Sequence, residues 1–281
     1  MDLALRHGPF VSELDPAAIA AYARATNDPN QRCLEASAVP PAFIVTRTFA
    51  AQEAATATIP RAVFDAARTG VHGAHDITIH RPLVVGEQLA TWSSLHGVRS
   101  SSAGTGVTLR IESLDGAGTP AVTELWTIMF VAATGFPDEG ASVPDHTLAP
   151  DARAAPIGEV VRPVDDDQPT RYAEVSGDWS AHHFDAAVAQ AGGFPGVFLH
   201  GLCTLAMAAG AVVAACADGE PARVARLAVR FSAPTHPGND LVVGLFDGGR
   251  TPSGDHVIGF EATSGGATVL KHGRAELVGP R

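Results

Sequence analysis

The sequence predicts an α+β fold in which two antiparallel sheets each curl around a helix. β-branched and aromatic runs of strand length fill the later part of each half, and a segment rich in small apolar residues follows Leu199. Small side chains let a sheet approach such a helix closely, so the helix can be buried on all sides. We therefore expect the helix of the C-terminal half to be long and central.

Length and charge restrict the possible classes of protein. The chain has 281 residues, of which 46% are hydrophobic and 17% are charged, and its formal net charge is -11. This length fits one large domain or two domains of roughly 130 to 140 residues, and the composition is typical of a soluble globular protein. No Lys/Arg cluster offsets the negative charge, which argues against a nucleic-acid partner because phosphates would be repelled.

Neither a targeting segment nor a membrane span is predicted. The N-terminal residues MDLALRHGPFVSEL carry charges at Asp2, Arg6 and Glu13 and lack the uninterrupted apolar core of a signal peptide, which leads us to expect a cytoplasmic protein. The apolar run from Gly201 to Ala217 is rich in small residues and lacks basic flanks, so a buried helix is favoured over a membrane span. The three cysteines are odd in number and suggest no disulfide framework.

The first half begins with helices. Residues 15–26 (DPAAIAAYARAT) start with an Asp-Pro entry and place apolar side chains on one helical face, which predicts a short helix. The sequence NDPN at 27–30 is typical of a turn. An Ala-rich segment from Phe49 to Ala67 follows an extended stretch and is expected to be helical, with an interruption at Pro60.

A meander of antiparallel strands is predicted after Asp76. β-branched or aromatic runs alternate there with Gly, Ser and Asp, and a hairpin turn is expected at Asp115 to Gly118. Residues 134–169 then lose periodicity and fill with Pro, Gly and Asp, so we predict a linker with one short strand at Glu159 to Pro163. The strand runs are DITIHRPL, QLATWSSLHGV, TGVTLRIESLD and AVTELWTIMFV.

The second half repeats this order of elements. A short helix is predicted at Thr170 to Val175, then a glycine-containing loop and the apolar helix from about Leu199 to Ala217. Four further strands are expected in the runs RVARLAVRFSAP, DLVVGLFDGG, HVIGFEATSG and TVLKHGRAELV. The predicted boundaries are an N-terminal unit at residues 1–135, a linker at 136–168 and a C-terminal unit at 169–281.

Matching motifs indicate that the two halves arose by duplication. The matches are Tyr22-Ala23 and Thr26-Asn27-Asp28 with Tyr172-Ala173 and Ser176-Gly177-Asp178 at an offset of 150, and Pro82, Gly86 and Leu89 with Pro234, Gly238 and Leu241 at an offset of 152. Chance recurrence of turn residues is the alternative explanation. Five residues after the aspartate, the first copy has Cys33 where the second has His183. We therefore expect one active site per chain, in the C-terminal half.

The segment from Tyr172 to Gly201 is the candidate active site. Asp178 and His183 lie in an irregular loop and would supply a carboxylate and a group that titrates near neutrality, able to share one water. A helix that starts at Leu199 to Leu202 leaves free backbone N–H groups around Gly201, with the positive end of the helix dipole behind them. Such a terminus suits an oxyanion.

These residues resemble the MaoC-like hydratases, particularly the type-2 or (R)-specific enoyl-CoA hydratases with a double hot-dog architecture. The family loop reads approximately S-G-D-x-N-P-x-H-x-D, and SGDWSAHHFD at 176–185 follows it except that Ser180-Ala181 replaces Asn-Pro. GGFPGVFLHGLCTLAMAA resembles the family segment G-F-x-x-x-I-L-H-G-L-C-T, and VRFSAPTHPGNDL resembles the strand pair R-F-x-x-P-V-x-P-G. VPPAF at 39–43 and VHGAHDITIHRPLVVGEQL at 71–89 are similar to the N-terminal repeat of the double hot-dog members.

The resemblance implies a hydro-lyase of fatty acid metabolism that adds water reversibly and syn across a trans-2-enoyl thioester, giving the (R)-3-hydroxyacyl product. Asp178 and His183 would hold the water and move its protons, and the backbone N–H of Gly201 would stabilise the enolate oxygen of the thioester. The N-terminal repeat would have lost its own catalytic loop and would make room for the acyl chain of a CoA or acyl-carrier-protein substrate. The residues expected to bind substrate are Ser176, Ser180, Phe198, His200 and Arg230, the last of them near a CoA phosphate.

Simpler interpretations stand beside these. Asp178 could be a turn carboxylate, His183 a structural histidine, His200 a packing residue and Arg230 a solvated strand residue. A hot-dog acyl-CoA thioesterase is one alternative enzyme, although hydrolysis there does not require the loop that joins the aspartate to the histidine. A non-catalytic acyl-thioester binding protein is the other alternative, since Ser180 and the alanine after it replace the family's Asn-Pro.

No cofactor and no metal is expected. Two groups of side chains suggest a metal, but neither has a known ligand spacing with a supporting helix or knuckle. Hot-dog units commonly pair their sheets side by side, so one chain could form that pair alone, and a homodimer is a further expectation. The two groups are His72, His75 and His80, and His182, His183 and Asp185.

Overall fold

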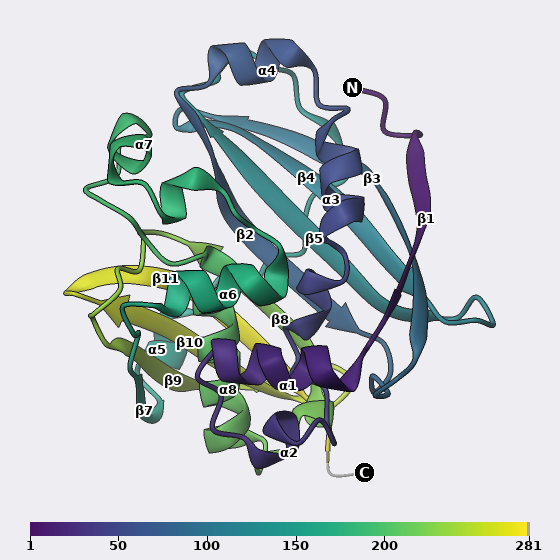
Figure 1. The fold of residues 1–281 in the computed structure, drawn as a ribbon, viewed down its shortest axis with the longest axis vertical. Helices are drawn as coiled ribbons and strands as arrows, with labels where there is room; N and C mark the ends of the chain where they lie inside the picture. The colour runs from purple at the N-terminus through teal and green to yellow at the C-terminus, as the bar shows by residue number, and fades with distance from the viewer. Residues whose placement is uncertain (280–281) are drawn as a thin grey trace.

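A computed structural model describes residues 1–279 of the chain. Two curved antiparallel sheets, one in each half, join edge to edge into one sheet of 11 strands, and helices pack against it (Figure 1). The predicted α+β, double hot-dog fold is confirmed. The two predicted sheets are therefore parts of one continuous sheet.

The strands of the two halves follow the same order. The N-terminal half has the order β1-β3-β4-β5-β2 and the C-terminal half β7-β9-β10-β11-β8, so each of these ten strands has a counterpart in the other half, while β6 lies outside this order and pairs with β3. This equivalence supports the duplication inferred from the motifs. The strands are β1 (Arg6–Glu13), β2 (Thr69–Ile79), β3 (Gln88–Ser101), β4 (Gly104–Leu114), β5 (Pro120–Val131), β6 (Glu139–Gly140), β7 (Pro156–Arg162), β8 (Val224–Phe231), β9 (Leu241–Arg250), β10 (His256–Ser264) and β11 (Ala267–Leu277).

The last three main strands of each half form the predicted meander. The strand that was expected to begin each meander, β2 or β8, lies at its other end. Strand β2 pairs with β5, and β8 pairs with β11. Strand β1 was not predicted, since the sequence RHGPFVSE lacks a clear alternation; it lies at the edge of the sheet, where a proline is tolerated. The short strand expected in the linker is β7, which pairs with β9.

The helices lie close to their predicted positions. The Ala-rich segment forms two helices, α3 and α4, and Pro60 is the N-cap of the second. The long apolar helix is α8, and the short helix before the loop is α6. The helices are α1 (Pro16–Ala25), α2 (Gln31–Leu34), η1 (Phe43–Thr46), α3 (Phe49–Thr56), α4 (Arg61–Ala66), α5 (Pro150–Arg153), α6 (Gln168–Ser176), η2 (Ala181–His183), α7 (Ala186–Ala191), α8 (Gly201–Cys216) and η3 (Pro221–Arg223).

Strands β2 and β8 join the two halves. They pair antiparallel, with Asp76 opposite Ala228. Across the junction, Arg226 donates to both carboxylate oxygens of Asp76, at 3.0 and 2.6 Å. The side-by-side pairing of two hot-dog sheets is thus made within a single chain.

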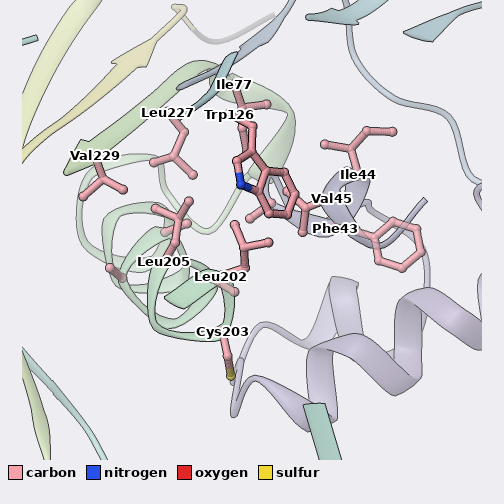
Figure 2. Packing of buried hydrophobic residues seen from close by; sticks show 14 of the residues in the cluster. Phe43, Ile44, Val45, Ile77, Trp126, Leu202, Cys203, Leu205, Leu227 and Val229 are labelled. Carbon is pink, nitrogen blue, oxygen red and sulfur yellow. The ribbon is translucent and has the colours of Figure 1, made fainter. Parts of the chain in front are cut away.

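Helix α8 is central to the C-terminal half. Its residues from Leu202 to Val213 are all buried. Leu205 lies opposite Leu227 on β8, and Leu202 lies below Trp126 on β5, so side chains of both halves gather over the helix (Figure 2). Within residues 1–279, no helix is long and apolar enough to cross a membrane.

The loops that follow α1 and α6 occupy different surroundings. Tyr22 and Tyr172 are both buried, and their ring centroids lie 6.0 Å apart, so the two repeated helices pack together. The loop after α1 then presses Asp28 toward the middle of α8, where a Cβ on Gly210 would lie 3.5 Å from the Asp28 carboxylate. Burial raises the pKa of the Cys33 thiol, which is therefore neutral and offers no titrating group in place of the second copy's histidine.

Candidate active site

A cavity of about 720 Å³ lies between the two halves of the chain. The N-terminal half contributes α3, β2 and β5 to its wall, and the C-terminal half contributes the loop after α6, the start of α8 and the end of β8. Seven of the eight site residues predicted from the sequence line this cavity. They are Ser176, Asp178, Ser180, His183, Phe198, His200 and Gly201.

The eighth residue, Arg230, does not line the cavity. It lies on β8 with its guanidinium 3.8 Å from the Asp145 carboxylate, and both side chains are exposed. A role for Arg230 toward a CoA phosphate stays a prediction.

Helix α6 delivers a carboxylate to the cavity. The helix ends at Ser176, and Gly177 follows in the left-handed conformation with a φ of 78°. A residue with a Cβ would be strained there, so glycine permits the sharp turn that places Asp178 on the cavity wall. The Asp178 N–H donates to Ser176 Oγ at 3.2 Å, which holds the turn.

Ser180 fixes the Asp178 carboxylate. Its backbone N–H and its hydroxyl both donate to Asp178 Oδ1, at 3.1 and 2.6 Å, and Oδ2 has no hydrogen bond within residues 1–279. Burial by itself would raise the pKa of Asp178, but the hydrogen bonds from the Ser180 hydroxyl and backbone N–H stabilise the carboxylate, and this pKa lies below its ordinary value. Asp178 is therefore ionised at neutral pH, with the hydroxyl of Ser180 beside its carboxylate.

His183 presents an unprotonated nitrogen. Its Nδ1 lies 2.8 Å from the carbonyl oxygen of Phe198, and because a carbonyl only accepts, Nδ1 carries the proton and Nε2 keeps its lone pair. Burial, reinforced by His200 and His182, lowers the pKa of His183 to about 3. The ring is thus a neutral hydrogen-bond acceptor at neutral pH.

His200 joins the loop to the start of α8. It occupies the N-cap position, and its Nε2 donates to the backbone carbonyl of Asp178 at 2.9 Å. Its ring stacks on that of His183, with centroids 3.7 Å apart, and packs against Tyr172 at 5.0 Å. His200 therefore holds both the carboxylate loop and the imidazole in place, while its buried Nδ1 has no partner among the described residues.

The first turn of α8 supplies free N–H groups. Within residues 1–279, the backbone N–H groups of Gly201 and Leu202 make no hydrogen bond, whereas that of Cys203 already bonds to the carbonyl of His200. The ring of Phe231 covers the Gly201 Cα closely, and a Cβ on Gly201 would lie 3.2 Å from it. Glycine thus leaves room between the free N–H groups and the cavity, and the helix dipole makes this terminus attractive to a negative oxygen.

The structure adds four residues to the predicted site. Tyr172, His72, Trp126 and Phe231 also line the cavity. Tyr172 is the first residue of the candidate segment, and Phe231 lies inside a segment that carried the family resemblance, but no chemical pattern marked either of them. His72 lies in the segment 71–89 compared with the N-terminal repeat, but as a single residue it was considered only as a metal ligand, and Trp126 reaches the cavity through strand pairing that a single sequence does not reveal.

One group of residues could hold a metal ion. Among the described residues, Asp178, His183 and His200 offer ligand atoms that lie within 4.8 Å of one another. The groups considered from the sequence do not assemble as sites, because His80 bonds to Thr123 and Asp185 instead caps α7.

Two family models match the chain, one in each half. The model described as MaoC like domain matches residues 150–264, and the one described as FAS1-like, dehydratase domain region matches residues 6–123. The chain is 32% identical over 216 residues to 3-hydroxyacyl-thioester dehydratase Y of Mycobacterium tuberculosis, a match that covers 74% of this chain and 72% of that protein. The chain belongs to the MaoC-like dehydratase family.

Further similarities agree with this assignment. This MaoC-like dehydratase is 32% identical over 211 residues to peroxisomal multifunctional enzyme type 2 of Drosophila melanogaster, which covers 74% of the chain but 35% of that longer protein. The crystal structure of a MaoC-like dehydratase from Phytophthora capsici has the same fold, with a TM-score of 0.81, 21% identity, and coverage of 99% of this chain and 96% of that one. The predicted family, fold and hydro-lyase class are confirmed.

Proposed function

We propose that this MaoC-like dehydratase adds water reversibly to a trans-2-enoyl thioester and gives the (R)-3-hydroxyacyl thioester. One observation carries the proposal. The ionised Asp178 and the neutral His183 share the cavity wall with the free N–H of Gly201, so two acceptors for a water lie beside a donor for a thioester oxygen. The name of one relative, a 3-hydroxyacyl-thioester dehydratase, supports the same reaction.

The protonation states define how water is activated. Water donates one hydrogen to Asp178 Oδ2 and the other to His183 Nε2, so its oxygen lone pair is directed at Cβ of the enoyl group. As the C–O bond forms, one of these acceptors takes a proton from the water, and the electrons of the double bond move to the thioester oxygen. The N–H of Gly201 stabilises that enolate oxygen. The same acceptor then returns the proton to Cα.

Syn addition follows from this arrangement. Neither side chain carries a proton to give before water binds, because Asp178 is ionised and the proton of His183 is engaged by the Phe198 carbonyl. The hydroxyl and the hydrogen added to the substrate therefore both come from one water on one face of the double bond.

Each half of the protein binds a different part of the substrate. The C-terminal unit, residues 169–281, holds the reacting carbons, and the N-terminal unit, residues 1–135, accommodates the acyl chain against Phe49, Ile128 and Phe130, which line the cavity. The carrier is CoA, the enzyme works in the cytoplasm, and a homodimer is its assembly. Acyl carrier protein is the alternative carrier, and comparison of crotonyl-CoA with crotonyl-acyl carrier protein distinguishes the two.

The experiment incubates the full chain with crotonyl-CoA and longer trans-2-enoyl-CoAs and follows the loss of enoyl absorbance. We expect hydration by the wild type and a loss of at least about 100-fold in kcat/KM for Asp178→Asn and for His183→Ala, since general acid–base groups contribute on that scale. His80→Ala is the matched control, because that histidine is exposed and its ring bonds to Thr123.

Other outcomes point to other functions. Release of free CoA would indicate a thioesterase, and tight binding of enoyl-CoA without turnover would indicate a binding protein. Hydration that survives both substitutions contradicts the proposal.

A further inference from the structure

A series of hydrogen-bonded polar side chains reaches the cavity wall from the interior of the N-terminal half. His75 on β2 and Glu124 on β5 have side chains with 0% exposure, and His75 Nε2 lies 3.1 Å from Glu124 Oε2. His75 Nδ1 lies 3.2 Å from Nε2 of His72, and His72 lines the cavity. The hydrogen-bonded series therefore runs from a buried carboxylate through one imidazole to a second imidazole at the cavity.

An irregularity in β2 brings the two histidines together. Residues three apart in a regular strand point to opposite faces of the sheet, so His72 and His75 would not meet. The register between β2 and β5 shifts between His72 and Ala74, which inserts one extra residue and turns His72 to the side of His75. Gly73 lies at this bulge, where a Cβ would be 3.2 Å from Met129 Cβ. Bulges of this kind often redirect a side chain next to a functional site.

Aromatic rings hold His72 from two directions. Its ring stacks on Trp126 with centroids 4.4 Å apart and planes 7° apart, and it contacts Phe231 at 4.5 Å. Phe231 also covers Gly201, so one aromatic ring separates His72 from the proposed oxyanion site. In the proposed function the N-terminal half accommodates the acyl chain, so we place a group that meets His72 on the acyl chain, beyond the reacting carbons.

One nitrogen of His72 is left for a ligand. Nε2 is engaged by His75, and the only other polar neighbour of the ring among the described residues is the backbone of Ala74, whose contact falls outside ordinary hydrogen-bond limits of distance and angle. Burial, and then the neighbouring His75, lowers the pKa of His72 well below its ordinary value, so the ring is neutral. A plain alkyl chain against this wall would leave Nδ1 with no partner better than the loose contact to Ala74, and a site built around a polar group disfavours substrates that cannot pair with it.

A role in substrate binding explains this buried series of side chains better than a contribution to protein stability does. A buried ion pair or hydrogen-bonded polar pair contributes little net stability, because removing the groups from water offsets their attraction. The pair instead fixes the ring orientation of His72, as outer hydrogen bonds do for histidines in other sites. His75 and Glu124 are thus positioning residues for His72.

We propose that the natural substrate is an enoyl thioester whose acyl chain carries a hydroxyl group, and that this hydroxyl hydrogen-bonds to Nδ1 of His72. A hydroxyl fits either tautomer of the ring, since it can donate or accept. The rest of this wall is apolar, with Phe49, Ile128 and Phe130, so it accepts the carbon skeleton that bears the hydroxyl. The inference rests on the proposed hydratase function and specifies its substrate class.

The test compares trans-2-octenoyl-CoA with the same substrate bearing a hydroxyl at C5, C6, C7 or C8. For the wild type we expect at least one hydroxylated substrate to exceed the plain one about 10-fold in kcat/KM, the effect of one well-formed hydrogen bond. His72→Phe retains an aromatic ring but removes the nitrogen, and the ratio should fall to within about twofold of unity. His80→Phe is the matched control and should retain the wild-type ratio, because His80 is exposed and bonds to Thr123.

A second readout isolates binding and the positioning role. Calorimetric titration with octanoyl-CoA and its hydroxylated analogues should show the same ratio in Kd without turnover. Glu124→Gln should lower the ratio for the hydroxylated substrate, and a conservative Glu124→Asp should restore part of it, which a purely structural role would not do.

Several results overturn this inference. They are a wild-type ratio near unity at every hydroxyl position, a ratio that survives His72→Phe, and an equal rise in KM for plain and hydroxylated substrates in His72→Phe, which would place His72 at the carrier. Absence of crotonyl-CoA hydration by the wild type is instead a failure of the proposed function. In that case the inference is tested by the ratio of Kd values for the plain and hydroxylated analogues alone.

Discussion

Lowering the pH from 7 to 5 should leave hydration almost unchanged, although a histidine is one of the two proposed acceptors. With a pKa of about 3, roughly 1% of His183 is protonated at pH 5, whereas at the ordinary value of 6.5 about 97% would be. Asp178, whose pKa is also lowered, stays ionised over the same range. A group with a lowered pKa loses its unprotonated form only as the pH falls through that value, so kcat/KM should fall by less than about 10% rather than about 30-fold.

Initial rates of crotonyl-CoA hydration, measured from pH 4 to 9 at constant ionic strength and with substrate well below KM, check this prediction. Samples held at each pH and returned to pH 7 show whether the enzyme has stayed folded. An acidic limb with its midpoint between pH 6 and 7, fully reversible and with a 30-fold loss at pH 5, would refute the argument that burial keeps His183 neutral.

Three further predictions concern the same loop and helix. Ser180→Ala removes the 2.6 Å hydrogen bond to Asp178, which at about 1.5–3 kcal/mol for a charged acceptor should lower kcat/KM at least about 10-fold, with recovery in Ser180→Asn; wild-type rates in Ser180→Ala would contradict the role of the hydroxyl. Gly201→Ala places a Cβ 3.2 Å from Phe231 beside the free N–H groups, and should lower kcat/KM about 10-fold or more with little change in Tm, so unchanged kinetics would exclude this helix start as the oxyanion site. His183 takes up a proton below pH 6.5 in the unfolded chain but only near pH 3 in the folded one, so it should reduce the free energy of unfolding by about 2 kcal/mol at pH 5. Urea titrations in which His183→Phe and the wild type lose equal stability between pH 7 and 5 would argue against this linkage.

Local features of the sequence were sufficient to predict most helices and strands. The helix expected from Leu199 to Ala217 is found at Gly201–Cys216, because its run of small apolar residues and the polar loop before it are local signals. Strand β1 was missed because Pro9 and flanking charges hide its alternation. The pairing of β2 with β5 and β8 was beyond reach, since partners distant in sequence decide it.

Some residues of the candidate site could likewise be predicted from the sequence and others could not. Asp178 and His183 could be predicted because they belong to one short loop motif, and the structure brings both to the cavity wall. The function of His72 could not, because it depends on a bulge and on Glu124 from another strand. Arg230 was expected near the substrate from its strand motif, but the direction of its side chain, toward Asp145, depends on a segment that no motif describes.

The central claim is that one water, held between Asp178 and His183, supplies both the hydroxyl and the hydrogen on one face of the double bond. Hydration of crotonyl-CoA in deuterium oxide, followed by NMR and chiral analysis of the 3-hydroxybutyryl product, tests it most directly. The account predicts the (R) product as a single diastereomer, with deuterium at Cα on the same face as the hydroxyl. An (S) product, anti addition, or a mixture of diastereomers formed before equilibration would contradict it.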